Sequence, residues 1–295
     1  MEKKSVVIYI PAHNEEDTIG DVIKIIRKYY SNPEDYYVKI VVVDDGSKDN
    51  TRKIAEQLNV DHIVVHPKNQ GLGAATRSGL RQAYEMGADI AVKIDADFQH
   101  DPSDIDKVIR PILEDKSDVV FGSRFMGKIN YKMPLYRRMG NSFFSFLTQF
   151  FTGLRVTDGQ TGLIATDRRY LKCFRLTSDY NETQQMIIDA WRNQLRFMEV
   201  PVVFHKRKAG ESFISWKYPF IVFPNIFRLF IHACPLKIFL PIGILLILSS
   251  IVTLYMFLNR ITMVGEDTVI ALFIGGLQII LFGLIADIVS KKRST

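Results

Sequence analysis

Two long apolar segments near the C-terminus set the strongest limit on how this chain can fold. Ile238 to Leu258 contains no charged residue, and neither does Val269 to Ala286. A helix needs about 20 apolar residues to cross the roughly 30 Å hydrocarbon core of a bilayer, and both segments are close to that length. Their charged flanks favour membrane spans over buried core helices. We therefore expect a transmembrane hairpin with helices at about 238–258 and 269–289.

Basic residues around these segments predict their orientation. Lys237 precedes the first segment, and residues 291–293 after the second are all basic. Lys and Arg are retained on the cytoplasmic side of a membrane, so we expect both termini, the N-terminal domain and a short basic tail at 290–295 to be cytoplasmic. The apolar run Val6–Ile10 is too short for a signal peptide. The prediction is an integral membrane protein facing the cytoplasm.

Composition narrows the classes of partner. The chain has 295 residues, a formal net charge of +6 and two cysteines. Cys173 and Cys234 give neither a disulfide framework nor metal-binding spacing. The positive charge favours anionic headgroups or anionic substrates, and no basic tract indicates nucleic acid. Residues 206–235 combine a basic loop with aromatic and apolar residues, which predicts amphipathic juxtamembrane helices; an ordinary packed helix is the alternative.

The first 205 residues alternate between strand and helix patterns. The strand patterns are "SVVIYI", "VKIVVV", "HIVV", "ADIAVK" and "SDVVFGSRF", followed later by short strands in "DGQTGLIATDRRYL" and "QLRFMEVPVVFHKR". Helical patterns lie between them, for example at Thr18–Tyr29 and Thr51–Leu58. This alternation predicts an α/β fold with a parallel sheet covered by helices on both faces. Ligands bind beyond the carboxyl ends of such strands, where each polar cluster of this sequence falls.

Two aspartates follow the strand pattern in "ADIAVKIDAD". Residues i and i+2 of a strand point the same way, so Asp95 and Asp97 present two carboxylates to one point if the chain stays extended. Carboxylate oxygens suit Mg²⁺ or Mn²⁺, which is held by one or two carboxylates plus substrate phosphates. Asp101 belongs instead to a helix start, "DPSD". We therefore expect a divalent metal at Asp95 and Asp97.

Several motifs together carry a family resemblance. "IPAHNEE", "VVVDDGSKDNT", "NQGLGAA" and "DADFQHDP", in this order, resemble the nucleotide-sugar half of the family 2 glycosyltransferases. "GSRF", "YRRMGN", "DGQTG", "RKAGES" and the closing "GGLQIILFGLIADIVSKKR" resemble the polyprenyl-phosphate branch, the dolichyl-phosphate mannose and glucose synthases. The resemblance covers nearly the whole chain. It implies a GT-A-type, Rossmann-like catalytic domain over 1–205 and a metal-dependent hexosyltransferase.

The resemblance also assigns roles to individual positions. It gives nucleotide contacts to Pro11, His13, Glu15, Asp44, Asp45, Gly71 and Gly73, with Asp45 as the direct contact to the base. It gives the metal and diphosphate site to Asp95, Asp97 and Gln99, and a catalytic role to these three and Arg124. It gives the acceptor phosphate or the diphosphate to Arg124, Arg137, Arg138, Arg207 and Ser212. Relatives often carry Lys after that serine, where this chain has Phe213. Lys217 is the candidate to take the place of that lysine.

The implied reaction transfers mannose or glucose from a GDP- or UDP-sugar to a polyprenyl phosphate, with inversion. A divalent ion and arginines stabilise the charge of the leaving diphosphate. The acceptor phosphate is already ionised near pH 7 and needs little help from a base. The alternative is transfer to a sugar or lipid hydroxyl, for which Glu182 or Asp179 would supply a catalytic carboxylate. A helix start in "SDYNET" is the simpler explanation for both acids, and a turn explains Asp158 about as well as a contact with substrate does.

Two readings from other classes stay open on the sequence. "GLGAAT" follows a short strand and opens a helix, with Asp95 about 20 residues further on, as in dinucleotide-binding oxidoreductases. Its third glycine is replaced by Thr76, and it follows a middle strand of the series. A membrane-anchored binding protein without catalysis is the other alternative, although every donor-site position carries a residue capable of the chemistry. The two membrane helices also allow pairing with a second copy of the chain.

Overall fold

The chain forms two compact units. The computed structural model describes residues 3–31, 33–177, 179, 181–207, 218–261 and 265–292. Contacts divide the chain into Met1–Phe223 and Pro224–Thr295. The predicted acceptor residue Ser212, the nearby Phe213 and Lys217, and residues 293–295 of the predicted basic tail lie outside the described residues.

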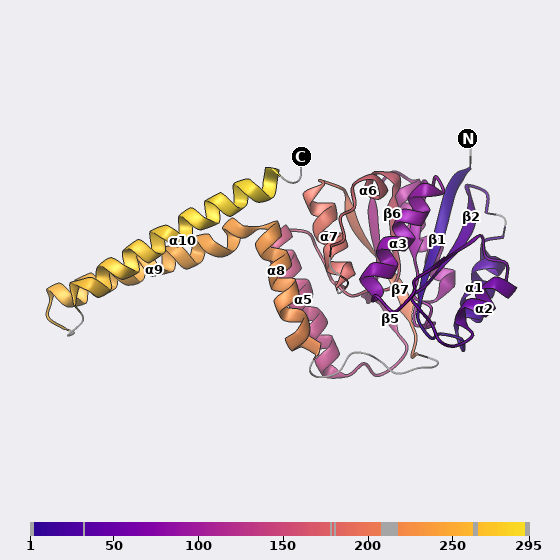
Figure 1. Ribbon diagram of the computed structural model, residues 1–295, viewed down its shortest axis with the longest axis horizontal. Coiled ribbons are helices and arrows are strands. Elements are labelled where there is room, and N and C mark those ends of the chain that lie inside the picture. The colour runs from indigo at the N-terminus through magenta and orange to yellow at the C-terminus, as the bar shows by residue number, and fades with distance from the viewer. Residues whose placement is uncertain are drawn as a thin grey trace. The chain divides into compact units, whose positions relative to one another are not determined.

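A seven-stranded sheet forms the centre of the first unit (Figure 1). The strands are β1 (Lys4–Ala12), β2 (Tyr36–Asp44), β3 (His62–Val65), β4 (Ile90–Lys93), β5 (Val119–Ile129), β6 (Ile164–Asp167) and β7 (Phe197–Phe204). Their spatial order is β3-β2-β1-β4-β6-β5-β7. All seven predicted strands are therefore confirmed, and so is the α/β class.

The expectation of a fully parallel sheet is wrong at β6. This strand runs antiparallel to both β4 and β5, whereas the other neighbouring pairs are parallel. Ile164, the first residue of β6, pairs with Lys93, the last residue of β4. The chain thus enters β6 from the edge of the sheet at which β4 ends. This reversal carries residues 158–162 to the edge where we expect the ligand.

Helices cover both faces of the sheet. They are α1 (Ile19–Tyr29), α2 (Thr51–Gln57), α3 (Leu72–Glu85), the short 3-10 helix η1 (Pro102–Asp104), α4 (Ile105–Leu113), α5 (Leu135–Thr152), α6 (Arg168–Cys173) and α7 (Glu182–Arg192). Alternate residues of β1 enter two separate apolar cores. Val6, Ile8 and Ile10 pack with residues of α1, α2 and α4. Val7 and Tyr9 pack with residues of α3, α6 and α7, so β1 lies between two layers of helices.

Asp189 on α7 makes stability depend on pH. Burial raises its pKa to about 6, against the opposing effect of a 2.7 Å hydrogen bond from the Arg175 backbone N–H. An unfolded aspartate titrates near pH 3.9, so ionised Asp189 penalises the folded state fully above about pH 6 and not at all below about pH 4. Asp189→Asn keeps an acceptor for Arg175. We expect it to raise the melting temperature at pH 7.5 and to lose this advantage near pH 4. A constant difference across this range would contradict the expectation.

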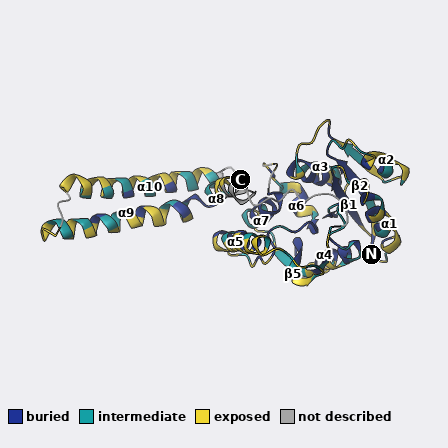
Figure 2. Ribbon diagram, turned by 90° about the horizontal axis from the view of Figure 1, so that it is seen from below, coloured by how far each residue is buried: buried dark blue, intermediate teal, exposed yellow. Residues whose placement is uncertain are grey.

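The second unit contains the predicted pair of long apolar helices. α8 (Tyr218–Ala233) enters it, followed by α9 (Pro235–Leu258) and α10 (Glu266–Lys292). By length and composition, α9 and α10 are each able to cross a membrane. Figure 2 shows exposed residues along both helices, and most of these are apolar. Exposed Leu and Ile side chains along a helix of this length favour a lipid environment over a soluble core.

Small residues bring α9 and α10 together. A Cβ on Gly243 would lie 2.8 Å from the carbonyl oxygen of Gly276, and a Cβ on Gly276 would lie 2.8 Å from that of Gly243. The Ser250 hydroxyl donates a 3.0 Å hydrogen bond to the carbonyl oxygen of Val269. Close backbone approach through glycine and a hydroxyl bond are the contacts that pair helices in lipid. The described residues of α9 and α10 therefore form a hairpin, as predicted.

Candidate active site

The candidate site lies where β1, β2, β3 and β4 end. Ala12 at the end of β1 pairs with Asp44 at the end of β2, which pairs with Val65 at the end of β3. On its other side β1 pairs with β4, where Tyr9 lies opposite Lys93. The loops that follow these strands therefore share one edge of the sheet. The polar clusters that follow these four strands therefore lie at one edge, as expected.

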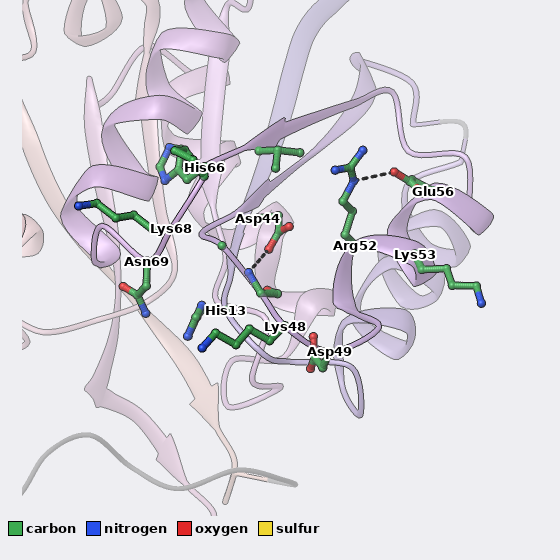
Figure 3. A pocket seen from close by; sticks show the side chains of 14 residues that line it. His13, Asp44, Lys48, Asp49, Arg52, Lys53, Glu56, His66, Lys68 and Asn69 are labelled. Carbon is green, nitrogen blue, oxygen red and sulfur yellow. Dashed lines mark hydrogen bonds and ion pairs between the residues drawn. The ribbon is translucent and has the colours of Figure 1, made fainter.

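An open pocket of about 900 Å³ occupies this edge beside β2 and β3 (Figure 3). Its lining is His13, Asp44, Gly46, Ser47, Lys48, Asp49, Arg52, Lys53, Glu56, Val65, His66, Pro67, Lys68 and Asn69. Four of these residues are lysine or arginine, which suits an anionic ligand. The volume is also in the range of pockets that hold small molecules and cofactors.

The pocket is lined by Asp44, and Asp45 is used elsewhere. The Asp45 carboxylate accepts hydrogen bonds from the backbone N–H groups of Gln70 and Gly71, at 2.9 and 2.8 Å. Its Oδ1 also lies 2.6 Å from Nδ1 of His66, whose Nε2 is 2.9 Å from the Ser78 hydroxyl. Asp45 therefore fixes the loop after β3. Asp44 lines the pocket, and the assignment of Asp45 as the direct base contact stays a prediction.

The two glycines after β3 serve that loop and the adjoining helix. Gly71 has φ +93°, a conformation that favours glycine, and it is the last residue before α3. Its N–H donates to Asp45, and the Gly73 N–H donates to the carbonyl oxygen of Asp179 at 3.1 Å. Pro11 is buried within β1. His13 Nδ1 lies 2.8 Å from the Asp45 carbonyl oxygen and also lines the pocket.

Asp95 and Asp97 lie in a turn rather than in the strand. β4 ends at Lys93, and Phe98 has φ +61°, so the chain does not stay extended through both aspartates. Burial, together with the charge of the nearby Asp95, raises the pKa of Asp97 to about 7. The N–H of Gln99 donates to Asp97 at 3.0 Å, whereas the Gln99 side-chain amide reaches the carbonyl oxygen of His205 at 3.5 Å.

A buried lysine lies beneath these aspartates. The Lys93 side chain is 1% exposed, and its Nζ is 3.1 Å from Oδ1 of Asp95 and 3.1 Å from Oε1 of Glu182. Burial alone would lower the pKa of Lys93, but the charges of Asp95 and Glu182 outweigh it and raise the pKa. The nearby Tyr9 hydroxyl is buried, and its pKa is raised by burial and by the same two carboxylates. Glu182 therefore belongs to an internal ion cluster, which the sequence pattern around it does not indicate.

Arg207 joins the loop after β1 to the aspartate turn. Its guanidinium forms an ion pair with the Glu15 carboxylate, and its Nε lies 4.0 Å from Oδ2 of Asp97. Burial raises the pKa of Glu15, although Arg207 opposes that shift. Arg207 and Glu15 are separated by 192 positions in the chain, so this contact brings the predicted nucleotide and acceptor residues together.

Arg124 is paired with Asp158 inside the protein. The Asp158 side chain is 0% exposed, and its two oxygens accept 2.6 Å bonds from Nε and Nη2 of Arg124. Asp158 also accepts the backbone N–H groups of Arg124 and Gln160, while the guanidinium stacks 4.9 Å from the Phe204 ring. Asp158 therefore orders a turn and holds a predicted catalytic arginine, and its contact with substrate stays a prediction.

Gly162 packs directly against the Asp95 carboxylate. A Cβ at this position would lie 2.0 Å from Oδ2 of Asp95 and 3.1 Å from Cδ2 of His100. The Gly162 N–H donates to Nε2 of His100 at 3.0 Å. His100 is buried, and its pKa falls to about 4 because of burial and the nearby Arg124, so it is neutral at physiological pH. The "DGQTG" segment therefore holds the aspartate turn in place through its contacts with Asp95 and His100.

The predicted acceptor residues Arg137 and Arg138 lie in the first turn of helix α5. Arg138 lines a second open cavity of about 560 Å³ between this helix and residues 156–157. The remaining lining is Phe125, Leu135, Met139, Asn141, Ser142, Ser145, Phe146, Gln149, Val156 and Thr157. Leu135, Met139 and Phe146 are also exposed on the surface of α5. The cavity thus combines an arginine with an apolar wall, next to the turn that Asp158 organises.

Oxygen donors for a divalent ion are present but few. Among the described residues no three His, Cys, Asp or Glu side chains gather closely enough to hold a metal ion. Asp95 Oδ1 is buried and lacks a hydrogen bond, since its contact with Lys93 is an ion pair without hydrogen-bond alignment. Two carboxylates with an available oxygen fit a Mg²⁺- or Mn²⁺-type ion that is also bound by substrate phosphates.

The family model for glycosyl transferase family 2 matches residues 7–175, which include every element of the pocket and the aspartate turn. The chain belongs to this family. A UDP-N-acetylglucosamine–dolichyl-phosphate N-acetylglucosaminyltransferase from Methanococcus voltae is 39% identical over 68% of this chain and 86% of its own length. An undecaprenyl-phosphate mannosyltransferase from Micrococcus luteus is 30% identical over 71% of this chain and 87% of its own length. These relatives confirm the resemblance to the polyprenyl-phosphate branch.

Solved structures confirm the fold. Glucosyl-3-phosphoglycerate synthase from Mycobacterium tuberculosis, in a complex with Mn²⁺ and UDP-glucose, aligns with a TM-score of 0.61. The alignment covers 78% of this chain and 79% of that one at 20% identity. At this identity the likeness concerns the fold alone, and it agrees with the GT-A-type, Rossmann-like architecture expected for residues 1–205. The oxidoreductase reading does not fit this family.

Proposed function

We propose that this glycosyltransferase moves one sugar from a nucleoside-diphosphate sugar to a polyprenyl phosphate at a membrane, with inversion at the anomeric carbon. The surroundings of Glu182 are the observation that favours a phosphate over a hydroxyl as the acceptor. A hydroxyl acceptor needs a carboxylate base, and this carboxylate is buried and paired with Lys93. A phosphate acceptor is already ionised and needs no such base. The names of the two relatives support the same acceptor class.

The donor side of the proposal uses the pocket beside β2 and β3. Asp44 lines the pocket, and its Oδ1 accepts a hydrogen bond from the backbone N–H of Ser47. Its second carboxylate oxygen is left for an N–H of uracil or guanine. Lys48, Arg52 and Lys68 give the pocket its positive charge. We assign the diphosphate to the aspartate turn, where Asp95 and Asp97 would hold Mg²⁺ or Mn²⁺ together with it. When bound, this ion offsets the negative charge that grows on the leaving diphosphate.

The acceptor side of the proposal uses three arginines. Arg138 lines the cavity beside α5, Arg124 is fixed by Asp158, and Arg207 lies beside Asp97. Guanidinium groups bind phosphate with two parallel hydrogen bonds, so they can hold the acceptor and the leaving diphosphate near each other. The lipid phosphate oxygen then attacks the anomeric carbon as the bond to the diphosphate oxygen breaks. The products are a lipid-phosphate-linked sugar and a nucleoside diphosphate.

Membrane attachment follows from the acceptor. A polyprenyl phosphate remains in the bilayer, and α9 and α10 are long and apolar enough to hold the catalytic unit beside it. Exposed Leu135, Met139, Phe143, Phe146 and Phe150 recur every three or four residues along α5. They form an apolar stripe that suits the headgroup boundary, in addition to the juxtamembrane helix expected at 206–235. We keep the predicted cytoplasmic placement of both termini and of the catalytic unit as part of the proposal.

A transfer assay tests the proposal. The full chain in detergent receives Mn²⁺, a short polyprenyl phosphate and labelled GDP-mannose, UDP-glucose or UDP-N-acetylglucosamine. We expect label to enter the lipid from one donor and to fall by at least about 100-fold with chelator or Asp97→Asn, since electrostatic stabilisation of the leaving group is lost. Asp35→Asn, at an exposed ion pair, is the control. Label that enters only hydroxyl acceptors would overturn the proposed acceptor.

A further inference from the structure

Both aspartates of the candidate metal site already face a cation of the protein itself. Lys93 Nζ is 3.1 Å from Asp95, and Arg207 Nε is 4.0 Å from Asp97. Lys93 is held in place by Glu182, and Arg207 by Glu15. The cluster therefore contains four carboxylates and two internal cations. Lys93 is shielded from solvent. A divalent cation that enters this site therefore meets positive charge that is already in place.

The internal cations oppose the binding of a metal ion on its own. Like charges repel over several ångströms, and the repulsion is stronger where water is excluded. Lys93 cannot move into solvent, because its side chain is 1% exposed and its ammonium group is bound by two carboxylates. Although Glu15 and Glu182 belong to the cluster, no three acidic or imidazole side chains of the described residues gather closely enough to hold a metal ion. A free divalent ion would meet two ligands and a fixed positive charge.

A diphosphate changes this balance. It adds negative charge beside Lys93 and Arg207 and supplies the missing oxygen ligands, as substrate phosphates do in Mg²⁺ sites. We propose that Lys93, anchored by Glu182, sets the two-aspartate site so that it takes a divalent ion together with a nucleoside diphosphate and excludes the free ion. Lys93 is thus a positioning residue. The inference rests on the proposed function only in requiring a donor that carries a diphosphate.

Manganese titrations followed by electron paramagnetic resonance test this directly, since bound Mn²⁺ loses the sharp signal of the free ion. We expect the wild-type chain to bind Mn²⁺ at least about 100-fold more tightly with UDP or GDP present than without. Samples of Mn²⁺ and nucleotide alone correct for the complex in solution. Lys93→Met removes the repelling charge and should raise affinity for Mn²⁺ alone by about tenfold. Glu182→Gln leaves Lys93 without one counter-charge and should lower affinity with nucleotide by about tenfold.

The two single variants are expected to change the Mn²⁺ affinity in opposite directions. Loss of structure would instead weaken Mn²⁺ binding in both. The double variant Lys93→Met with Glu182→Gln avoids a buried unpaired carboxylate at 182 and keeps the test valid if Lys93→Met folds poorly. Compared with Glu182→Gln alone, it should bind free Mn²⁺ about tenfold more tightly. Asp189→Asn, on the same helix but outside the cluster, should change neither affinity.

Two results would overturn the inference. One is wild-type binding of Mn²⁺ alone that equals its binding with nucleotide. The other is that removal of Lys93 leaves the affinity for free Mn²⁺ unchanged, or lowers it, on both the wild-type and the Glu182→Gln backgrounds. Neither titration contains an acceptor. Failure of the transfer assay with polyprenyl phosphate would therefore leave the metal result standing, and the two failures are distinguishable.

Discussion

Asp158→Asn is expected to destabilise the catalytic unit by about 3–5 kcal/mol, because it leaves the buried Arg124 guanidinium without its charged partner. The carboxylate is 0% exposed and accepts two guanidinium bonds of 2.6 Å. It also accepts two backbone N–H groups, which an amide would satisfy only in part. Urea unfolding of the variant and the wild type measures the difference. The exposed pair of Arg110 and Asp35 gives the control, since Asp35→Asn should cost less than about 1 kcal/mol.

The pH dependence of this difference has a definite sign. Burial opposes the ionised form of Asp158, but Arg124 outweighs it and lowers the pKa below the usual value. A carboxyl whose pKa is lowered by folding stabilises the protein above its unfolded pKa near 3.9 and loses that effect as pH falls through the folded value. The gap between wild type and Asp158→Asn should therefore be full at pH 7 and shrink under acid conditions. A gap that stays constant down to pH 3 would show that the ion pair contributes little.

A replacement of both partners separates stability from catalysis. Arg124→Met with Asp158→Leu removes both charges, and buried ion pairs replaced by apolar residues often retain stability. We expect this double variant to unfold closer to the wild type than Asp158→Asn does. Its sugar transfer should remain low if Arg124 contacts a phosphate. Recovery of transfer together with stability would assign Arg124 a purely structural role.

Much of the fold could be predicted from the sequence, because the patterns that indicate strands and membrane helices are local. Strand patterns of four to nine residues and polar residues after each of them predicted a single edge for the site, and the charge-free segments predicted α9 and α10. The direction of β6 was not readable, since "LIATDRR" has the same alternation in either direction. Its orientation depends on the "DGQTG" segment reaching the edge at which β4 ends, which is a tertiary contact.

The surroundings of the predicted site residues depend on contacts between distant parts of the chain. Asp44 and Asp45 are adjacent in sequence, and only the hydrogen bonds of Asp45 to Gln70, Gly71 and His66 show which carboxylate remains for a ligand. Glu182 looked like a helix-capping residue because its partner Lys93 lies 89 positions earlier. The signal for Lys93 was present, since a lysine inside the apolar run "ADIAVKI" must find a carboxylate when it is buried.

Gly162→Ala is expected to reduce sugar transfer by about 100-fold or more, while leaving the rest of the fold intact. The added methyl group would lie 2.0 Å from Oδ2 and 2.6 Å from Cγ of Asp95. Asp95 has little room to retreat, because its other oxygen contacts the buried ammonium group of Lys93. Displacement of a catalytic group by about 1 Å can cost two orders of magnitude in rate. The measurement is the rate of transfer at saturating donor, together with the Mn²⁺ affinity in the presence of nucleotide.

The same segment offers a matched control. A Cβ on Gly159 would lie 3.4 Å from the Ser145 hydroxyl and 3.7 Å from the Gln184 amide, which are tolerable contacts. Gly159→Ala should therefore keep transfer within a few-fold of the wild type, whereas Gly162→Ala loses both transfer and metal binding. Full activity of Gly162→Ala would mean that the Asp95 carboxylate is not needed in this position, and the metal and diphosphate would have to be assigned to Asp97 alone. Equal losses in both variants would instead trace the effect to the "DGQTG" backbone.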